Sequence, residues 1–570
     1  MGTEMRDRVV HLEILIWRGP MKKPLSIFKC GISILIALSC LSSCHKAITA
    51  PETQLTSMEK TSSNSSSEST LTSTSADSEG STSPLEQDPI SPGFSSASLV
   101  SADDGLALEF LKLPGVTKVE KRSAFNQDQY ILSFEMPIDH NDPGKGTFTQ
   151  RMYVYYKDKD APNMFNVGGY NLYYGSYDGD FYDEMEPLFS KTYNCNFFEA
   201  EYRFDGLSKP QGFQNEKTDY WEYLTCAQAS EDFHTMIESM KTLFSGKWCF
   251  EGMSKGGEFT AYHLSRYPDD ADLFLAECAM LDLGQNSPGL CEYVYSTAGD
   301  DRYGKEKAQE YRDLLLEFQV EMIKHRDDLE DKYYNLATNY YSVVFAPAFT
   351  KEILFDCTVL DARYVYQYDS VDTPEGNYFK RMKEVLDLKD ANGASERAMF
   401  VGKACDLLTD LYGPWQYAYS EHDTISDPET GNLYAFLFQC FFEDGYYNYD
   451  FSYLRQALEK DGSGASLYIT EEMEPDVYGY RIPEHHKNLF SYSPDVRNAR
   501  LRAVENTTTP LILVNGLSDI YQAAEIKESK NPNTHIFNIP SSFHDECTLD
   551  YLSEEQFKEY DAIVREALGI

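Results

Sequence analysis

Residues 249–257 limit what this chain can fold into more than any other stretch of the sequence. The apolar residues up to Phe250 predict the end of a buried strand, and residues 255–267 predict a helix that stops before Pro268. A short turn therefore joins a strand to a helix, and Ser254 lies at its apex. The sequence predicts that this serine is held above the edge of a sheet.

The turn has the pattern G-x-S-x-G, with Gly252 and Gly256 on either side of Ser254. A turn this sharp strains the serine backbone and leaves no room for side chains on the neighbouring residues. It exposes the hydroxyl and aims the next backbone N–H, that of Lys255, at the place where an oxyanion would form. The five-residue pattern also occurs by chance, so the alternative is an ordinary glycine-rich turn with a solvated serine.

Two polar residues follow later strands of the chain. The apolar run 510–514 precedes Asp519, and the predicted strand 535–539 precedes His544. The order Ser254, Asp519, His544 is the order in which α/β-hydrolases carry nucleophile, acid and base. In this arrangement His544 accepts the proton of Ser254, and Asp519 fixes the tautomer of the imidazole. The alternative is a pair of ordinary polar loop residues.

Other residues compete for these roles on paper. Asp545 is a rival acid, but neighbours in sequence rarely reach each other in the geometry a triad needs. We expect His140 to be structural, because it precedes the nucleophile in an early hairpin. His263, on the helix after the serine, and His535, inside a predicted strand, should both lie away from the site.

A second oxyanion donor is expected where an apolar strand runs into glycines before the nucleophile. Residues 164–167 are such a strand, and Gly168, Gly169 and Tyr170 follow it. The backbone N–H of Gly169 or Tyr170 is the predicted donor. The alternative is a plain turn.

Several short motifs lie in and before the serine turn: Ile138-Asp139-His140, Gly169-Tyr170-Asn171, Glu201-x-Arg203, Ser208-x-Pro210, Tyr223-Leu224-Thr225 and Ser254-Lys255-Gly256-Gly257. On these motifs, residues 125–260 resemble the secreted serine peptidases of the mycelial tripeptidyl aminopeptidase family and, more distantly, the lysosomal prolyl-X carboxypeptidase group. The Ser-Lys-Gly-Gly form of the turn is far more specific than G-x-S-x-G. Gly168 departs from the family pattern, and the middle of the chain matches poorly.

The resemblance implies a serine exopeptidase that releases short peptides, tripeptides above all, from free N-termini, with no metal or cofactor. Acylation and deacylation of Ser254 would be its chemistry. A serine esterase or acyl-hydrolase is the alternative enzyme, because the same triad cleaves esters. A binding lipoprotein with an inactive hydrolase fold is the alternative of another class.

The stretch 288–505 is too long for a loop and contains helical periodicity, as in Ala308, Leu315 and Met322. We therefore expect an α/β-hydrolase core of residues 101–287 and 506–570 with a large, mostly helical cap inserted between them. A cap that roofs the site would favour exopeptidase action, with Glu292, Asp300 or Asp301 as guesses for the carboxylate that receives the substrate amine. The alternative is a separate domain remote from the site.

The N-terminus predicts export. Residues 1–44 contain basic residues after Met21, an apolar stretch, and the sequence Leu41-Ser42-Ser43-Cys44, which looks like a bacterial lipobox with Cys44 as the lipidated residue. Met21 is the suspected true start. The Ser- and Thr-rich residues 45–100 predict a disordered tether. The expected location is extracytoplasmic, on the bacterial cell membrane through a lipid anchor; the alternative is an uncleaved anchor.

The composition of the chain limits the partners that it is expected to bind. With 92 acidic against 50 basic residues and a formal net charge of −42, the chain is not expected to bind nucleic acid. Its twelve cysteines contain no C-x-x-C pair, so metal-site spacing is absent. Nine of them lie beyond the predicted export segment, and an odd number implies at least one free thiol.

Overall fold

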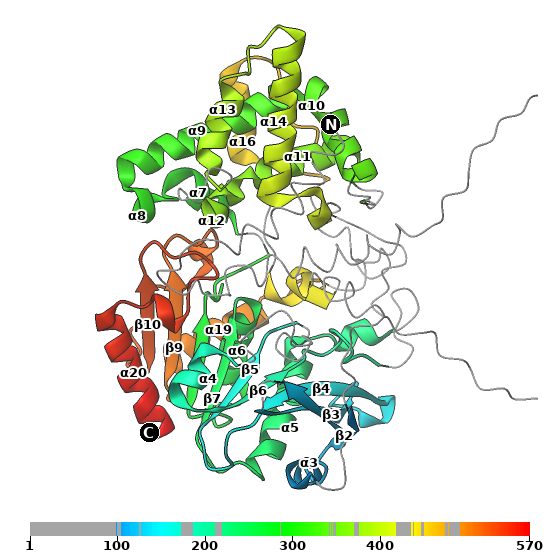
Figure 1. Cartoon of the computed structure of the whole chain (residues 1–570), viewed down its shortest axis with the longest axis vertical. Coiled ribbons are helices and arrows are strands. Elements are labelled where there is room, and N and C mark those ends of the chain that lie inside the picture. The colour runs from blue at the N-terminus through cyan, green and yellow to red at the C-terminus, as the bar shows by residue number, and fades with distance from the viewer. Residues whose placement is uncertain are drawn as a thin grey trace, which may run out of the picture.

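The structure, a computed structural model of the chain, places a mixed sheet at one end and a bundle of helices at the other (Figure 1). The predicted lipidation site Cys44, the export segment 1–44 and nearly all of the tether 45–100 lie outside the described residues. The described residues are 98–99, 104–124, 127–170, 172, 186–210, 219–285, 287–340, 343, 345, 349–369, 376–417, 435–436, 438–445, 450–473, 477 and 491–570.

The ten strands form one sheet in the order β1-β2-β3-β4-β6-β5-β7-β8-β9-β10. From β6 to β10 neighbouring strands are parallel, and β1 to β4 add an antiparallel edge that joins at β6. The strands are β1 (Ser98–Leu99), β2 (Val116–Ala124), β3 (Gln127–Pro137), β4 (Thr147–Tyr155), β5 (Asn163–Val167), β6 (Asn196–Ala200), β7 (Trp248–Met253), β8 (Leu273–Glu277), β9 (Leu511–Gly516) and β10 (Thr534–Ile539).

The central parallel strands are buried on both faces, which explains their continuous apolar sequence. Helices α5 (Cys226–Lys241), α6 (Lys255–Arg266) and α19 (Asp495–Asn506) cover one face. Helices α4 (Leu188–Tyr193) and α20 (Glu554–Leu568) cover the other. A parallel sheet with helices on both faces and a serine turn after β7 is the predicted α/β-hydrolase core, which is thereby confirmed.

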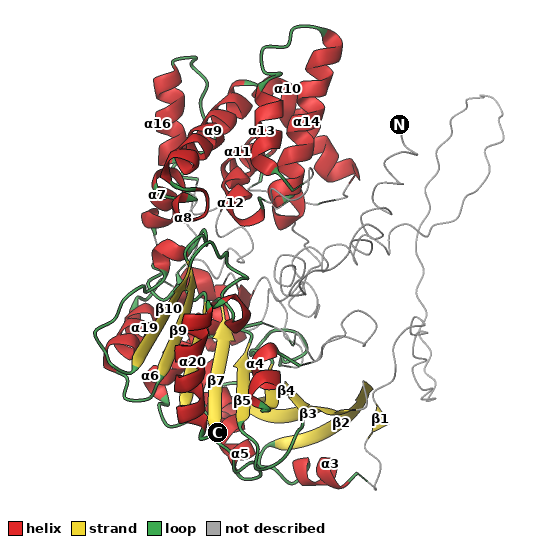
Figure 2. Cartoon of the chain, turned by 60° about the vertical axis from the view of Figure 1, so that its left-hand side comes forward, coloured by secondary structure: helices red, strands yellow, loops and turns green. Residues whose placement is uncertain are grey.

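The second body of helices lies beyond the end of the sheet to which the parallel strands point (Figure 2). It has its own core of buried apolar residues, separate from the two clusters that flank the sheet. Its helices are α7 (Pro288–Ser296), α8 (Asp300–Tyr303), α9 (Lys305–Lys324), α10 (Arg326–Asn335), α11 (Lys351–Asp361), α12 (Val365–Tyr368), α13 (Tyr378–Leu386), α14 (Ala394–Tyr412) and α16 (Ser452–Asp461).

The predicted boundary at residue 505 differs from the packing. Residue 505 falls inside α19, whose Val496, Ala499 and Ala503 belong to the apolar cluster between α6 and the sheet. Helix α19 is therefore a helix of the sheet layer, and the helical insertion ends before Asp495. The sequence does not reveal that α19 belongs to the sheet layer, because polar, proline-containing residues flank the helix and no apolar strand precedes it.

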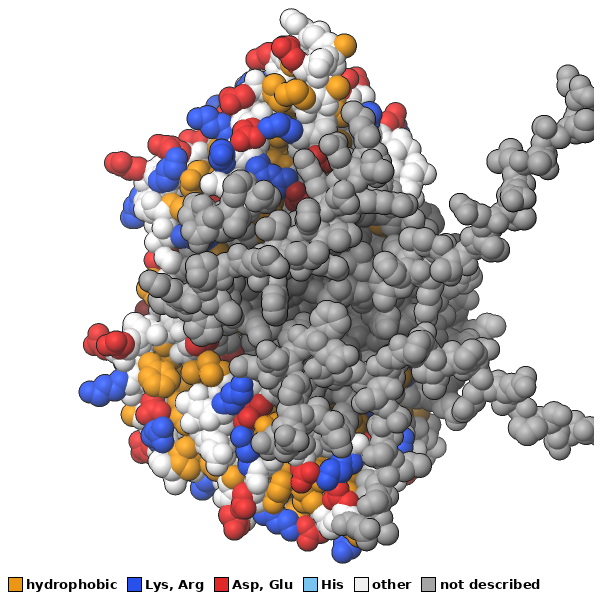
Figure 3. Space-filling model, viewed as in Figure 1, with side chains coloured by type: hydrophobic (Ala, Val, Ile, Leu, Met, Phe, Trp, Pro, Cys, Tyr) orange, Lys and Arg blue, Asp and Glu red, His pale blue; other side chains and the backbone are white. Residues whose placement is uncertain are grey.

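Acidic and basic side chains are interspersed over both ends of the molecule on the face in view (Figure 3). Within the part of the chain that the structure describes, none of the helices is both long and apolar enough to cross a bilayer.

Candidate active site

The turn after β7 holds Ser254 in a strained backbone conformation, with φ 54° and ψ −121°. A positive φ is uncommon for a residue with a side chain, so the surrounding contacts must impose it. The Ser254 N–H donates to the carbonyl of Glu277 in β8 over 2.9 Å, and the Ser254 carbonyl accepts from Glu258 over 2.9 Å. These bonds fix the serine between the sheet and the first turn of α6.

The glycines on either side of Ser254 are required by close approach rather than by conformation alone. A Cβ on Gly252 would lie 2.4 Å from the backbone of Gly256, and one on Gly256 would lie 2.0 Å from the carbonyl oxygen of Val167 in β5. No side chain fits at those distances. Both positions of the G-x-S-x-G pattern are therefore glycine because the serine turn packs directly against β5.

Ser254, His544 and Asp519 form one chain of hydrogen bonds. His544 Nε2 lies 2.9 Å from Ser254 Oγ, and His544 Nδ1 lies 2.6 Å from Asp519 Oδ2. Asp519 is fully buried and Ser254 is 4% exposed. The structure therefore brings together the three residues that the sequence singled out from three separate strands. This arrangement can perform nucleophilic acyl transfer with a general base.

The second carboxylate oxygen of Asp519 is also fully used. Oδ1 accepts from the backbone N–H of Tyr521 over 2.9 Å and from Gln367 Nε2 over 3.0 Å. The other end of the Gln367 amide accepts from the backbone N–H of His544 over 3.5 Å. Gln367 belongs to α12, so the insertion contributes a side chain that contacts both the acid and the histidine segment.

The electrostatic surroundings favour a charged imidazole. Burial, the largest single influence, lowers the pKa of His544, but Asp519, Cys278 and Glu525 together act in the opposite direction and raise the pKa from its ordinary value of 6.5 to about 10. Asp519 therefore stabilises the imidazolium that forms when Ser254 gives up its proton.

The predicted oxyanion donors lie on two adjoining segments. Lys255 is the first residue of α6, where a backbone N–H has no acceptor within its own helix. Gly169 has φ +76°, and a Cβ on it would lie 3.1 Å from the N atom of Gly256. The segment of Gly169 and Tyr170 thus lies directly against the start of α6. Both predicted donor segments adjoin the serine turn, and their role remains a proposal.

The side chain of Lys255 has a position that the sequence reasoning did not foresee. Its ammonium is buried, donates to the carbonyl of Gly169 over 2.7 Å, and lies 4.1 Å from the ring centroid of Tyr202. It also lies 5.4 Å from the ring centroid of Tyr170. Lys255 therefore fastens the segment of the second predicted oxyanion donor to the serine turn, by a hydrogen bond and by cation–π contact.

A buried ion network holds the neighbouring segments to α6. Arg500 of α19 pairs with Glu258 of α6, with an N–O distance of 2.8 Å, and with Asp444 of the π-helical turn η8 (Cys440–Asp444). Burial raises the pKa of the Glu258 carboxyl to about 8, and Arg500 acts in the opposite direction. Removing Arg500 would leave two buried carboxyl groups without their cation.

The rival residues have other partners. His140 Nε2 lies 2.7 Å from Asp232. His263 is buried and hydrogen-bonds to Ser230 through Nδ1 and to Asp270 through Nε2. His535 lies in β10. Asp545 adjoins His544 in sequence, but the imidazole hydrogen-bonds to Asp519.

The insertion also contacts the loop that carries His544. Asp301 accepts from the backbone N–H of Ser541, and the Arg302 guanidinium stacks 4.2 Å from the ring centroid of Phe543. The Tyr521 ring meets His544 edge-to-face at 5.1 Å, and its hydroxyl bonds that of Tyr364 over 2.8 Å. The alternative of a domain remote from the site does not agree with these contacts.

Two of the three carboxylates suggested as amine receivers already have partners in the structure. Asp300 is paired with Arg312 over 2.7 Å, Asp301 binds the Ser541 N–H, and Glu292 is exposed on α7. The role of these carboxylates toward a substrate amine stays a prediction.

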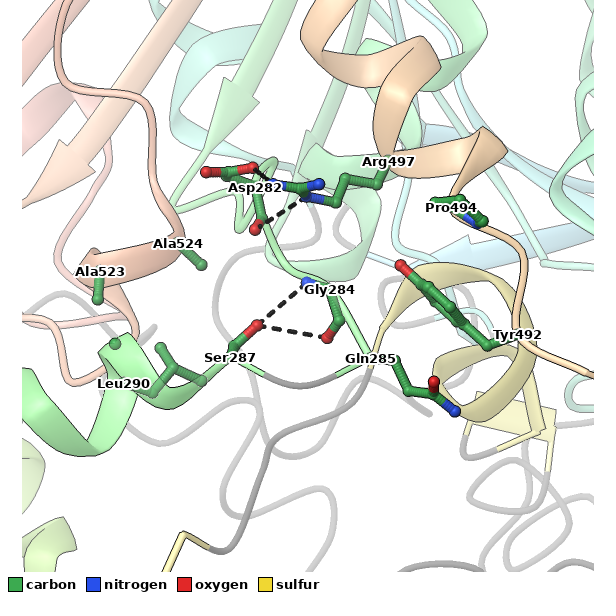
Figure 4. Close-up of a pocket in the computed structure, with 11 residues that line it drawn as sticks. Asp282, Gly284, Gln285, Ser287, Leu290, Tyr492, Pro494, Arg497, Ala523 and Ala524 are labelled. Carbon is green, nitrogen blue, oxygen red and sulfur yellow. Dashed lines mark hydrogen bonds and ion pairs between the residues drawn. The ribbon is translucent and has the colours of Figure 1, made fainter.

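A pocket of about 400 Å³ lies at the neck where the chain leaves the sheet layer for the insertion and returns from it (Figure 4). An ion pair between Asp282 and Arg497 crosses this neck, and Ser287 hydrogen-bonds to Gly284. The triad residues do not line it. In the described part of the chain, no three His, Cys, Asp or Glu side chains are grouped so that they could hold a metal ion.

Comparison with known proteins connects this geometry to a family. Residues 102–377 match the model of the family described as PS-10 peptidase S37. The matched range contains Ser254 and the start of the insertion, whereas Asp519 and His544 lie beyond it. The resemblance to a serine peptidase family is thus confirmed, and the second half of the triad is supported by geometry alone.

One curated relative is the prolyl tri/tetrapeptidyl aminopeptidase of Streptomyces mobaraensis, 28% identical over 237 residues. The matched segment covers 42% of this chain and 45% of the relative, so the chain spans less than half the length of the relative it matches.

Solved structures with a similar arrangement include the proline iminopeptidase of Mycobacterium smegmatis, 12% identical with a TM-score of 0.30, which covers 77% of this chain and 97% of its own. The acetylester hydrolase of Corynebacterium glutamicum is 8% identical with a TM-score of 0.31, and covers 77% of this chain and 95% of its own.

Proposed function

We propose that the chain is a serine exopeptidase that releases tripeptides or tetrapeptides from free N-termini, because residues 102–377 match the model of the PS-10 peptidase S37 family. The observation that carries the proposal is the hydrogen-bonded chain of Ser254, His544 and Asp519 within a peptidase-family sequence. The curated relative, named a prolyl tri/tetrapeptidyl aminopeptidase, supports the length of the released peptide and a preference for proline.

The reaction follows from the geometry. Ser254 Oγ attacks the carbonyl carbon of the scissile bond while His544 Nε2 takes its proton. The backbone N–H of Lys255 and that of Gly169 or Tyr170 receive the negative oxygen. His544 then donates the proton to the leaving amine, which departs with the rest of the substrate chain. A water molecule, deprotonated by His544, releases the peptide from Ser254.

The proposal that the enzyme is an exopeptidase, and not an endopeptidase, depends on the position of the helical insertion. An endopeptidase needs an open groove on both sides of the scissile bond. Here α12 and the segment of Asp301 and Arg302 contact the triad loops from the side to which the sheet strands point. A substrate chain that ends at this roof presents its ammonium to a site with little water, where a carboxylate partner is strongly favoured.

The first test compares p-nitroanilides of tripeptides and tetrapeptides that end in proline with their N-acetylated forms. Blocking the amine should lower kcat/KM by at least about 100-fold, because a desolvated carboxylate loses its partner. The same peptides ending in alanine measure the preference for proline. Equal cleavage of free and acetylated substrates would show that the site is open and that the exopeptidase reading is wrong.

The same assay separates the alternatives. A p-nitrophenyl acyl ester that is hydrolysed faster than every peptide would identify an esterase. A fluorophosphonate probe should label Ser254 of the wild-type chain and leave the Ser254→Ala variant unlabelled. If the folded wild-type chain takes no label, it is a binding protein with an inactive hydrolase fold.

A further inference from the structure

The buried ammonium of Lys255 acts on one peptide group beside the serine turn. Lys255 is 3% exposed, and its Nζ donates to the carbonyl oxygen of Gly169 over 2.7 Å. That carbonyl and the N–H of Tyr170 belong to the same peptide group, because one peptide bond joins the two residues. A contact that holds the carbonyl therefore also fixes the direction of the N–H.

The direction of this N–H follows from the geometry of the peptide group. A trans peptide group is planar, so its C=O and its N–H point in opposite directions. The Gly169 carbonyl points at the Lys255 ammonium, which lies 4.1 Å from the ring centroid of Tyr202. Tyr202 is fully buried in the apolar cluster between α6 and the sheet. The carbonyl thus points into the interior, and the N–H of Tyr170 points away from it.

A second hydrogen bond holds the following peptide group. The carbonyl of Tyr170 accepts from the N–H of Tyr202 over 2.9 Å. Gly169 has φ +76°, and a Cβ on it would lie 3.3 Å from Lys255 Cγ, so this turn packs closely on the lysine. Within the described residues, the N–H of Tyr170 has no acceptor. The turn is therefore fixed at both carbonyls, and this N–H is available to a ligand.

The Lys255 ammonium carries a charge that no neighbouring carboxylate neutralises directly. In the part of the chain that the structure describes, Lys255 forms no ion pair with Asp or Glu; the rings of Tyr202 and Tyr170 lie next to it. A cation at a peptide carbonyl draws electron density to the oxygen, which makes the N–H of the same group a stronger donor. Burial keeps water from screening this effect.

We propose that the Lys255 side chain is a positioning residue for the oxyanion hole, and that the second donor is the N–H of Tyr170, not that of Gly169. The ammonium aims this N–H and strengthens it, whereas the backbone N–H of Lys255 itself meets the oxyanion. One residue thus serves both halves of the oxyanion hole, through its main chain and through its side chain. This inference rests on the serine peptidase chemistry proposed above.

The experiment compares two inhibitors on the full chain and on its Lys255→Met variant. A tripeptide aldehyde that ends in prolinal reacts with Ser254: the Oγ–C bond forms, the carbonyl electron pair moves to oxygen, and the serine proton passes to His544. The oxygen of this adduct occupies the oxyanion position. The matching tripeptide alcohol binds the same subsites but forms no oxyanion. Methionine is unbranched and of similar length, so it fills the space of the lysine without a charge or a donor.

In Lys255→Met, the Ki of the aldehyde should rise by about 10- to 100-fold, and kcat/KM on the matching p-nitroanilide should fall by the same factor. This effect is smaller than the 10²–10³-fold cost of deleting an oxyanion donor, because the N–H is misaimed and not removed. The Ki of the alcohol should stay nearly unchanged. A matched control is Arg312→Met, since Arg312 is also buried and donates to the carbonyl of Ala298 over 2.7 Å in the insertion. This control should leave the ratio of the two Ki values unchanged.

A folded Lys255→Met variant that keeps the wild-type preference for the aldehyde would overturn the inference and leave the proposed peptidase function standing. Equal weakening of both inhibitors would show a merely structural lysine and would overturn it as well. A wild-type chain that binds the aldehyde no more tightly than the alcohol would overturn both proposals.

A crystal structure of the wild-type aldehyde adduct decides the matter even if Lys255→Met fails to fold. The adduct oxygen should lie about 2.7–3.1 Å from the backbone N atoms of Lys255 and Tyr170. An adduct oxygen that hydrogen-bonds to the N–H of Gly169 in place of Tyr170 would refute the assignment.

Discussion

At the scale of single residues, the site consists of groups held in positions that they would not adopt alone. Ser254 keeps a positive φ because β5, β8 and α6 surround it, and Lys255 keeps a buried ammonium because Gly169 and an aromatic ring receive it. The sequence predicted the three triad residues because each follows a strand whose apolar run is visible locally. The direction of the Lys255 side chain was not predictable, since Tyr202 reaches it only through the fold.

The nucleophile gives the most direct prediction. Ser254→Ala should reduce kcat by roughly 10⁶-fold, because the acyl-enzyme route is lost together with the proton transfer to His544. Peptide hydrolysis is the measurement, with circular dichroism as the check that the variant folds. The loss of one hydroxyl should leave stability nearly unchanged. Normal turnover by a folded variant would end the hydrolase assignment.

The pH profile reports on His544. The base must be neutral to accept the serine proton, so kcat/KM should fall as the pH drops below the pKa of His544. Asp519 raises this pKa, so the midpoint of the fall in kcat/KM on the acidic side of the profile, its acidic limb, should lie at a pH above 6.5. Asp519→Asn removes the negative charge, so the limb should move to lower pH while kcat falls about 10⁴-fold. A limb that stays in place in this variant would contradict the assigned pairing.

At the scale of elements, the strands and the long helices were predictable from the sequence, whereas the four-residue helix α12 was not. The strands β7, β9 and β10 appear as apolar runs, and α9 shows a helical period. Helix α12 is four residues long, which is too short for any period, yet it brings Gln367 to the triad. The boundary at 505 was misplaced for a related reason, because the packing of α19 on α6 depends on tertiary contacts alone.

Gln367 should position the triad without joining in the chemistry. In Gln367→Ala, the Asp519 carboxylate loses one hydrogen-bond donor. The loss of this hydrogen bond to a charged group should weaken transition-state stabilisation by about 1.5–3 kcal/mol and lower kcat by roughly 10- to 100-fold. The less compensated carboxylate should also move the acidic limb of the pH profile to higher pH. A matched control is Gln319→Ala, since Gln319 is buried in the insertion and donates to the carbonyls of Val359 and Leu360, away from the triad. If both variants lose the same activity and neither shifts the limb, Gln367 has only a structural role.

At the scale of the whole molecule, the sheet layer and the helical insertion have separate apolar cores, and side chains of the insertion contact Asp519 and the loop that carries His544. The net charge of −42 keeps such a chain soluble and self-repelling. The location of the protein is still a proposal: the lipobox-like sequence at Cys44 supports a lipid anchor, and residues 45–100 would hold the folded part away from the membrane.

Lipidation of Cys44 is testable by mass spectrometry of the mature protein from a bacterial host. Cys44→Ala should abolish the acyl modification and normal processing, whereas Cys40→Ala, in the same segment, should leave both intact. Mature protein with an unmodified Cys44 would refute the anchor. Two or more acyl chains are expected, because a single chain gives only marginal membrane binding.

The insertion separates Ser254 from Asp519 by 265 residues of chain, and the ion pair between Asp282 and Arg497 closes its neck. A ribosome adding about 5–20 residues per second therefore makes the nucleophile roughly 15–50 s before its acid and base. During that interval the nascent polypeptide contains a serine with no partner to deprotonate it. The hydrogen-bonded triad cannot be complete until β9 and β10, which precede Asp519 and His544, have been synthesised.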